Sequence, residues 1–294
     1  MLSILIPTKD YNCCKLVESL HAQCEAASLT HEIIVGEDGS SSQGLSMNAA
    51  IDDIPQCRRV IQATNIGRAA IRNLLAKEAK CKNIMFIDSD AVVEHHDIIA
   101  KYTAALQDNE VVCGGLYHAT TLDNIGCSLR YKYEKKADKL RSAAERAKNP
   151  YDKFSTFCFA IRRRIFQKIE FSDKISKYGH EDTLFGRELQ RRGIAIKHID
   201  APLLHSGLES NSVYLEKVRT SIETLVLVEN EIESTPLLQC YRKLQKLHLA
   251  TPMAHIWRHT QRLLCRNLLG KNPSLTILGI YKIGFLCNIK NNIK

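Results

Sequence analysis

The sequence predicts an α/β fold, in which a mostly parallel sheet is flanked by helices and followed by an α-helical C-terminal extension. Over residues 1–208, short apolar segments alternate with segments of helical periodicity, as expected of parallel strands joined by crossover helices. From Ser212 onward the pattern is helical throughout. Charge follows the same division, because residues 235–294 hold ten Lys or Arg and no Asp or Glu in a chain of net charge +9. We therefore expect one domain over residues 1–208 and a basic helical extension over residues 209–294.

The first half of the chain contains apolar segments typical of buried strands. They cover residues 2–7, 31–40, 58–63, 83–90 and 110–117. Between them, Leu16, Leu20, Cys24 and Ala27 recur at helical spacing, and residues 66–79 and 96–107 show the same periodicity. Strands that alternate with helices of this length indicate a parallel sheet.

Beyond Cys127 the pattern changes. Residues 130–150 form a highly charged helical stretch, which is either a solvated surface helix or a substrate lid. The following segments predict a strand and short helix over 154–169, a helix over 180–193 that stops at Gly193, and a strand over 194–199. The helices of the extension should break near Pro236, Pro252 and Pro273.

Cysteine usage indicates a reducing compartment. The eleven Cys residues are irregularly spaced without a CxxC pair, and the N-terminus lacks the pattern of a signal peptide. We therefore expect reduced thiols, mostly as small apolar core residues, in a cytoplasmic protein. A membrane span needs roughly 18 to 20 apolar residues. The nearest candidate, "LTILGIYKIGFLC", is shorter and carries Lys282.

Acidic residues follow two of the predicted strands. Asp38 ends one, and Asp88 and Asp90 end another, with only Ser89 between them. In an extended stretch the latter two carboxylates project to the same side, where they suit a hard cation such as Mg²⁺ or Mn²⁺. The structural alternative is that Asp90 caps the next helix and Asp88 pairs with a Lys. Neither GxGxxG nor GxxxxGK[ST] is present, so a dinucleotide fold and a P-loop are not supported.

Six segments in order carry a more specific signal. They follow one another in the order that is found in one enzyme family: "SILIPTKD", "IIVGEDGSS", "NIGRAAIRN", "MFIDSDAVV", "KYGHEDTLFGREL" and "APLLH". Over residues 1–208 the chain resembles family 2 glycosyltransferases, which have the GT-A fold. The resemblance implies an inverting transferase that takes a sugar from a nucleotide-sugar with the help of a divalent metal.

The resemblance also assigns roles at matching positions. Asp88-Ser89-Asp90 resembles the family's DxD motif, in which Asp90 and His205 would hold Mn²⁺ or Mg²⁺. The nucleotide would be bound by Thr8, Asp38, Asn65, Gly67, Arg72 and Asp88, with the Arg complementing phosphate charge. Asp182 would be the general base, and Glu181 would bind acceptor hydroxyls. The structural alternative for the last pair is that acids favour the first turn of a helix.

Some residues depart from the family pattern. Lys9-Asp10 stands where many members have Tyr-Asn, and Glu37-Asp38 replaces Asp-Asp, so the base, expected to be uracil, is less defined. The QxxRW motif of processive synthases is absent, which favours transfer of a single sugar. A nucleotidyltransferase would need a Gly-rich loop after the first strand, and "PTKDYNCCK" has no Gly. A non-catalytic, membrane-associated protein on this fold would not need the intact acids.

The basic extension predicts contact with an anionic surface. Arg258, Arg262 and Arg266 recur every four residues and share one helix face, and Trp257 is placed to sit at a membrane interface. We therefore expect peripheral association with the inner face of the cell membrane and a glycan or lipid-linked acceptor. The alternative is that these helices pack on the catalytic domain with solvated basic faces. Nucleic acid is not expected as a partner, because no binding motif accompanies the charge.

Overall fold

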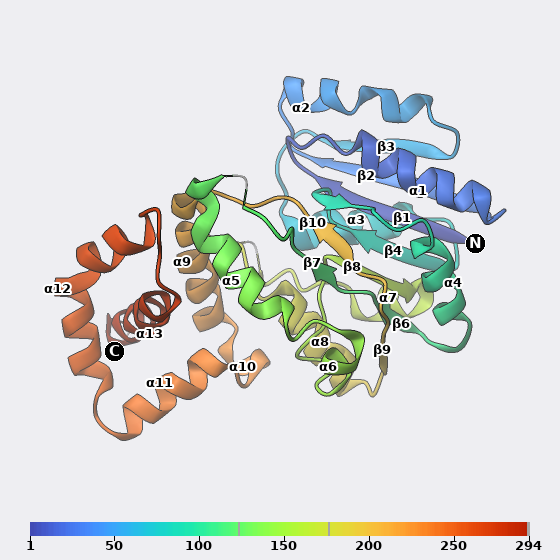
Figure 1. The fold of residues 1–294 in the computed structure, drawn as a ribbon. Coiled ribbons are helices and arrows are strands. Elements are labelled where there is room, and N and C mark those ends of the chain that lie inside the picture. The colour runs from blue at the N-terminus through green and yellow to red at the C-terminus, as the bar shows by residue number, and fades with distance from the viewer. Residues whose placement is uncertain (123, 176, 293–294) are drawn as a thin grey trace. The chain divides into compact units, whose positions relative to one another are not determined.

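The computed structural model describes residues 1–122, 124–175 and 177–292 (Figure 1). The strands are β1 Leu2–Thr8, β2 His31–Asp38, β3 Cys57–Gln62, β4 Asn83–Ile87, β5 Ala91–Val92, β6 Val111–Cys113, β7 Leu116–Tyr117, β8 Cys158–Arg162, β9 Ile196–His198 and β10 Leu203–His205. The helices are α1 Cys14–Ala26, α2 Ser42–Met47, η1 Ala49–Asp53, α3 Arg68–Glu78, α4 Ile98–Asp108, η2 Ile125–Cys127, α5 Ser128–Asp138, α6 Ala143–Ala147, α7 Arg163–Ile169, α8 Glu181–Arg191, α9 Asn211–Leu227, α10 Glu229–Ile232, α11 Pro236–Lys246, α12 Ala250–Leu268 and α13 Leu275–Asn292.

Two compact units divide the chain. Unit 1 consists of Met1–Ala119, Asp138–Ser176 and Glu181–Gly207, and unit 2 of Thr120–Ala137, Lys177–His180 and Leu208–Lys294. Unit 1 holds the sheets, and unit 2 is built mainly from helices. The division of the chain into a domain over residues 1–208 and an extension over residues 209–294 stays a prediction.

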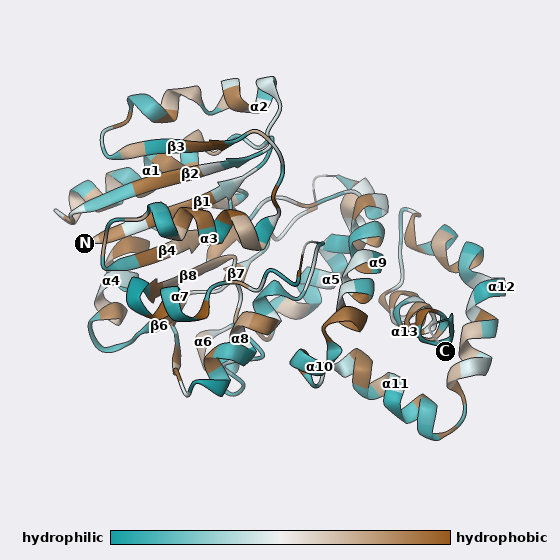
Figure 2. Cartoon of the chain, turned by 180° about the vertical axis from the view of Figure 1, so that it is seen from behind, coloured by the Kyte–Doolittle hydropathy of each residue, from teal (hydrophilic) through white to brown (hydrophobic). Residues whose placement is uncertain are grey.

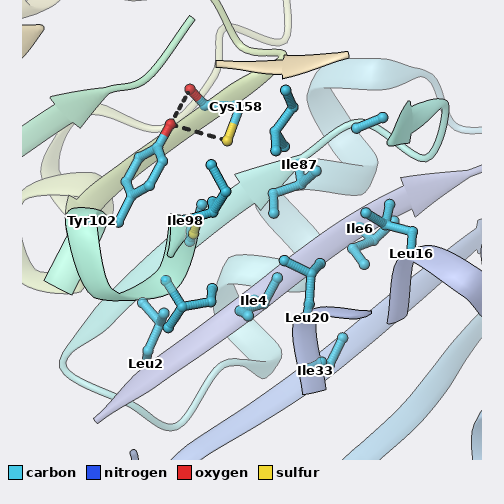
Figure 3. Packing of buried hydrophobic residues seen from close by; sticks show 14 of the residues in the cluster. Leu2, Ile4, Ile6, Leu16, Leu20, Ile33, Ile87, Ile98, Tyr102 and Cys158 are labelled. Atoms are coloured by element: carbon cyan, nitrogen blue, oxygen red, sulfur yellow. Dashed lines mark hydrogen bonds between the residues drawn. The ribbon is translucent and has the colours of Figure 1, made fainter. Parts of the chain in front are cut away.

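The main sheet of unit 1 confirms the predicted fold class. Its strand order is β3-β2-β1-β4-β8-β6-β9, and all neighbouring pairs are parallel except the two that involve β8. Apolar side chains on its two faces form two buried clusters, which bury β1 and β4 almost completely. Figure 3 shows one of them, where the Tyr102 hydroxyl donates to the Cys158 carbonyl oxygen at 3.0 Å and so satisfies a buried polar group.

A small second sheet positions the later functional residues. Its strand order is β5-β10-β7, with β10 antiparallel to β5 and parallel to β7. In this register His205 lies opposite Ala91, and Leu204 lies opposite both Val92 and Tyr117. The residues just outside the paired positions, Asp90 and His118, are thereby brought beside the end of β10.

The helices of unit 2 correct one expectation about the basic extension. Trp257 on α12 is 5% exposed and packs against Tyr281 and Phe285 of α13, with ring centroids 6.0 and 5.4 Å away. Ala254 and Leu268 share this buried face, because helical residues three and eleven positions apart lie on the same side. Trp257 is therefore a core residue and does not lie at an open interface.

The exposed side of α12 has the expected charge. Arg258, Arg262 and Arg266 are all exposed, and Arg258 donates hydrogen bonds to Asn288 and Asn292 of α13. Figure 2 shows α11 and α12 alternating hydrophilic and hydrophobic residues, whereas central strands such as β4 and β8 are mostly hydrophobic. Among the described residues, no helix combines the length and apolarity needed to cross a membrane.

The charged stretch 130–150 is not a simply solvated surface helix, and its role as a substrate lid stays a prediction. Within unit 2, Arg130 of α5 pairs with Glu134 at 2.8 Å, and its guanidinium lies 5.0 Å from the centre of the Tyr214 ring of α9. Within unit 1, Arg146 of α6 is 4% exposed and donates to backbone carbonyls of Cys113 and other residues. The two helices are anchored by the buried Arg146 and by the partly buried Arg130.

The cysteines match the prediction of reduced thiols. All eleven are free, and eight of them are buried. Burial raises the pKa of Cys24 to about 12, which leaves that thiol protonated and unreactive at neutral pH.

Candidate active site

The two acids after β4 have separate partners. The strand ends at Ile87, and Asp88 and Asp90 lie in the turn that follows, not in an extended stretch. Arg72, 1% exposed on α3, donates to the Asp88 carboxylate, and its guanidinium also lies 5.7 Å from the centre of the Phe171 ring. Arg72 is therefore buried and paired with Asp88, and its role toward a phosphate stays a prediction.

Asp90 meets His205 across the small sheet. Its Oδ2 lies 3.0 Å from Nε2 of His205, and its backbone carbonyl accepts hydrogen bonds from the backbone and hydroxyl of Ser206. A side chain at Gly207 would place its Cβ 2.2 Å from Asp90 Oδ2, so only glycine fits there. The alternative that Asp90 caps the next helix is not what the structure shows, since Asp97 occupies the N-cap of α4.

A buried chain of side chains orients His205, and the sequence analysis missed it. His205 Nδ1 lies 2.9 Å from His118 Nε2, and His118 Nδ1 lies 3.0 Å from Asp138 Oδ1. Asp138 also pairs with Arg141 at 2.8 Å. Arg141 Nη1, which can only donate, also lies 3.1 Å from His118 Nδ1, so that nitrogen faces both a donor and the Asp138 acceptor. The chain of contacts therefore fixes the orientation of both imidazole rings. The available signal was a His just after β7, which becomes informative only once β7 is paired with β10.

This geometry fits a divalent cation. Two ligand atoms at roughly 2.1 Å from one octahedral cation are roughly 3.0 Å apart, which matches the separation of Asp90 Oδ2 and His205 Nε2. Burial alone would raise the pKa of Asp90, but the hydrogen bond from His205, the charge of His205 and the charge of Arg68 hold it below its ordinary value. A carboxylate that stays ionised beside an oriented imidazole suits Mn²⁺ or Mg²⁺.

Asp38 organises the loop before α3. Its carboxylate accepts from the backbone N–H groups of Ile66 at 2.7 Å and Gly67 at 3.1 Å and from the Asn65 amide at 3.0 Å. Gly67 has φ of +94°, a conformation that favours glycine, and it precedes the first turn of α3. Asp38, Asn65 and Gly67 thus form one hydrogen-bonded group at the carboxyl end of β2, which is where open α/β sheets bind their ligands.

Thr8 and Glu37 lie at neighbouring strand ends. Thr8, the last residue of β1, is buried and donates from its hydroxyl to the Tyr11 carbonyl at 3.3 Å. The exposed Tyr11 hydroxyl lies 3.3 Å from the Ser206 hydroxyl. Glu37 is fully buried and accepts from Ser40 and Asn48, which makes it a structural residue.

Glu181 and Asp182 open α8, as the sequence predicted. Asp182 Oδ1 accepts from the Thr183 backbone N–H at 2.7 Å. Burial, followed by the charge of Glu181, raises the pKa of Asp182 to about 6. A carboxyl with this pKa is ionised at neutral pH and is basic enough to accept a proton.

Arg68 interacts with an acid of each candidate group, Glu181 on α8 and Asp90 after β4. Its guanidinium lies 3.8 Å from the Glu181 carboxylate, is about half exposed, and acts electrostatically on Asp90. It lies one helical turn before Arg72, so two Arg residues on one face of α3 have different environments. The family resemblance assigned a nucleotide-binding role to Arg72, and burial, which separates the two Arg residues, is not visible in the sequence.

Comparison with known proteins places this geometry in context. The model of the family "Glycosyl transferase family 2" matches residues 3–170. None of the curated proteins searched matches the chain.

Solved structures show the same fold at low sequence identity. A mannosyltransferase from Pyrobaculum calidifontis, in complex with GDP-Man and Mn²⁺, aligns with a TM-score of 0.61 and 14% identity over 99% of this chain and 86% of that one. Glucosyl-3-phosphoglycerate synthase from Mycobacterium tuberculosis, with Mg²⁺ and UDP, aligns with a TM-score of 0.52 and 12% identity over 80% of each chain. TarS from S. aureus aligns with a TM-score of 0.50 and 18% identity over 78% of this chain and 40% of TarS. The GT-A fold is therefore confirmed.

Proposed function

This chain belongs to glycosyl transferase family 2 and is a glycosyltransferase, and we propose that it moves one sugar from a UDP-sugar to an acceptor hydroxyl with inversion and with a divalent metal. The observation that carries the proposal is that Asp90 and His205 lie 3.0 Å apart, while Arg68 acts electrostatically on Asp90 and lies 3.8 Å from Glu181. Asp182, with its raised pKa, directly follows Glu181.

The leaving-group side uses residues at the carboxyl ends of the strands. Asp90 and His205 would hold Mn²⁺ or Mg²⁺, which supplies positive charge for a departing diphosphate. Arg68, exposed and close to these acids, complements the phosphates in the role first assigned to Arg72. Thr8 and the loop of Asn65 and Gly67, which Asp38 holds by hydrogen bonds, would bind the nucleoside.

The acceptor side uses α8. Glu181 accepts a hydrogen bond from an acceptor hydroxyl, and Asp182 takes the proton of the attacking hydroxyl. The new bond forms between the acceptor oxygen and the anomeric carbon as the carbon–phosphate oxygen bond breaks, and its electron pair leaves with the nucleoside diphosphate. Attack from the face opposite the diphosphate inverts the anomeric centre.

The exposed Arg residues of α12 support a further part of the proposal. Arg262 and Arg266 present positive charge in a segment that has no acidic residue. Such a surface attracts anionic lipid headgroups, each Arg contributing about 1 kcal/mol near the membrane. We therefore propose a cytoplasmic enzyme at the inner face of the cell membrane that acts on a glycan or lipid-linked acceptor.

The test is a panel of nucleotide-sugars measured for metal-dependent hydrolysis and for thermal stabilisation. UDP with Mn²⁺ should stabilise the fold by about 2.7 kcal/mol at a hundred times its dissociation constant, and UDP with a chelator should do so much less. GDP is the matched control, since one structural neighbour holds GDP-Man. Equal stabilisation with and without metal would rule out the metal role of Asp90. If GDP stabilises the fold more than UDP does, the base of the donor is guanine and not uracil.

A further inference from the structure

A cluster of metal-binding side chains lies outside the candidate active site. His21 and Glu25 on α1 and His31 at the start of β2 each place a ligand atom within 4.8 Å of the other two. Among the described residues this is the one group of three His, Cys, Asp or Glu side chains that meets this distance. Its members come from opposite ends of the short connection between α1 and β2.

The two imidazoles face each other in a fixed arrangement. Nδ1 of His21 lies 3.0 Å from Nε2 of His31. Nδ1 of His31 lies 2.9 Å from the Leu29 carbonyl oxygen, which can only accept, so this nitrogen carries the proton. His31 therefore directs an unprotonated Nε2 toward His21, and a backbone carbonyl on the second ring nitrogen is the usual support of a metal-bound His.

Burial and exposure within the cluster suit an ion that enters from solvent. The His31 side chain is 2% exposed, whereas that of Glu25 is 60% exposed and lies one helical turn after His21. The buried imidazole thus provides a fixed ligand. Oε1 of Glu25 lies 3.8 Å from Nδ1 of His31, so this exposed carboxylate has to turn toward Nε2 to close over an ion. Two imidazoles and one carboxylate form a donor set that binds Zn²⁺ with a fourth position left for water.

The cluster is far from the sugar-transfer residues. His31 begins β2 and Asp38 ends it, and eight residues of strand place the two ends roughly 23 Å apart. An ion here would join the last turn of α1 to the first residue of β2, at the amino ends of the parallel strands. It would not contact the candidate catalytic acids.

We propose that His21, Glu25 and His31 form a zinc site that is separate from the catalytic metal site and fastens α1 to β2. This proposal does not depend on the proposed glycosyl transfer. A zinc ion bound to the folded chain alone stabilises it in proportion to the logarithm of its concentration.

The experiment uses the full chain carrying Asp90→Asn, so that the candidate catalytic site does not contribute. The metal-free protein is titrated with Co²⁺, whose visible absorption reports four-coordinate binding, and the bound Co²⁺ is then displaced with Zn²⁺. His21→Gln and Glu25→Gln are each added, and Glu18→Gln, an exposed acid on the same helix, is the matched control. His31 is left unchanged because its burial makes a folding defect the expected result of its replacement.

We expect one ion per chain in the Asp90→Asn protein and in the Glu18→Gln control, and an affinity at least about tenfold weaker with His21→Gln or Glu25→Gln. The metal-free melting temperatures of the four proteins should agree, which separates ligand loss from unfolding. If either His21→Gln or Glu25→Gln binds as tightly as the control, the three residues are not a common site. The two His would then form an ordinary hydrogen bond.

Discussion

Charged residues occur in two contrasting settings in this molecule. In unit 1, Asp88, Asp90 and Asp182 are wholly or partly buried, and each has a named partner. In unit 2, Arg262 and Arg266 stand exposed on α12. Burial fixes a charge in position and shifts its pKa, whereas an exposed charge is screened by salt and acts mainly as part of a field. One substitution should therefore have a large effect in the first setting and a small one in the second.

The largest effect is expected at the candidate base, the partly buried Asp182. Asp182→Asn should lower turnover by about 10² to 10⁴, because the amide keeps the contact with Thr183 but cannot accept the proton. Donor binding should be retained, as measured by thermal shift with UDP and Mn²⁺. Glu181→Gln is the matched control, and it should mainly raise the acceptor KM. If Asp182→Asn turns over as fast as the unsubstituted enzyme, the general base is another residue.

An intermediate effect is expected at the buried chain behind His205. His118→Leu should weaken Mn²⁺ affinity by about 10- to 100-fold, because His205 loses the polar partner that orients its imidazole ring. His118→Gln, which retains an acceptor near the same place, should recover part of the loss. The dissociation constant for Mn²⁺ measured with UDP is the readout, and equal affinities in both variants would show that His118 is only a packing residue.

The pH dependence should reflect the raised pKa of Asp182, about 6. Below this pH the carboxyl is protonated and cannot act as a base, so kcat should fall about tenfold for each pH unit as the pH decreases. The same shift means that the folded chain binds more protons than the unfolded chain between pH 3.8 and about 6. The contribution of Asp182 to stability therefore falls as the pH rises through this window, and Asp182→Asn should remove that slope. A pH-independent kcat between pH 5 and 7 would contradict the assignment.

The smallest effect is expected on α12. Arg262→Gln should weaken binding to vesicles with anionic lipid by about fivefold, corresponding to about 1 kcal/mol, and the loss should shrink as salt rises. Arg262→Lys keeps the charge and is the matched control. If the unsubstituted protein does not bind vesicles with anionic lipid at low salt, a soluble acceptor becomes the better proposal.

Local features of the sequence were sufficient for much of the fold. The apolar segments that end at Thr8, Asp38 and Ile87 are strands, and Glu181 opens a helix where the acids and the following periodicity predicted one. Gly193 adopts φ of +66° just beyond the end of α8, as expected of a helix stop. These features depend on interactions between residues that are close in the sequence, and they can therefore be predicted from the sequence.

The site itself was determined only in part by the sequence. The family resemblance indicated Asp90 and His205, but the chain from His205 through His118 to Asp138 depends on the register of β5, β10 and β7. That register joins segments about a hundred residues apart, and no local pattern specifies it.

The sequence by itself determined which chemical groups are present and at which strand or helix end each one stands. Tertiary structure decided which of them are buried: Arg72 rather than Arg68 is buried and pairs with Asp88, and Trp257 packs into the core of unit 2. The physical reason is that burial depends on which helix face meets a neighbour. Side chains one turn apart have the same local sequence environment and acquire different roles only when the elements pack.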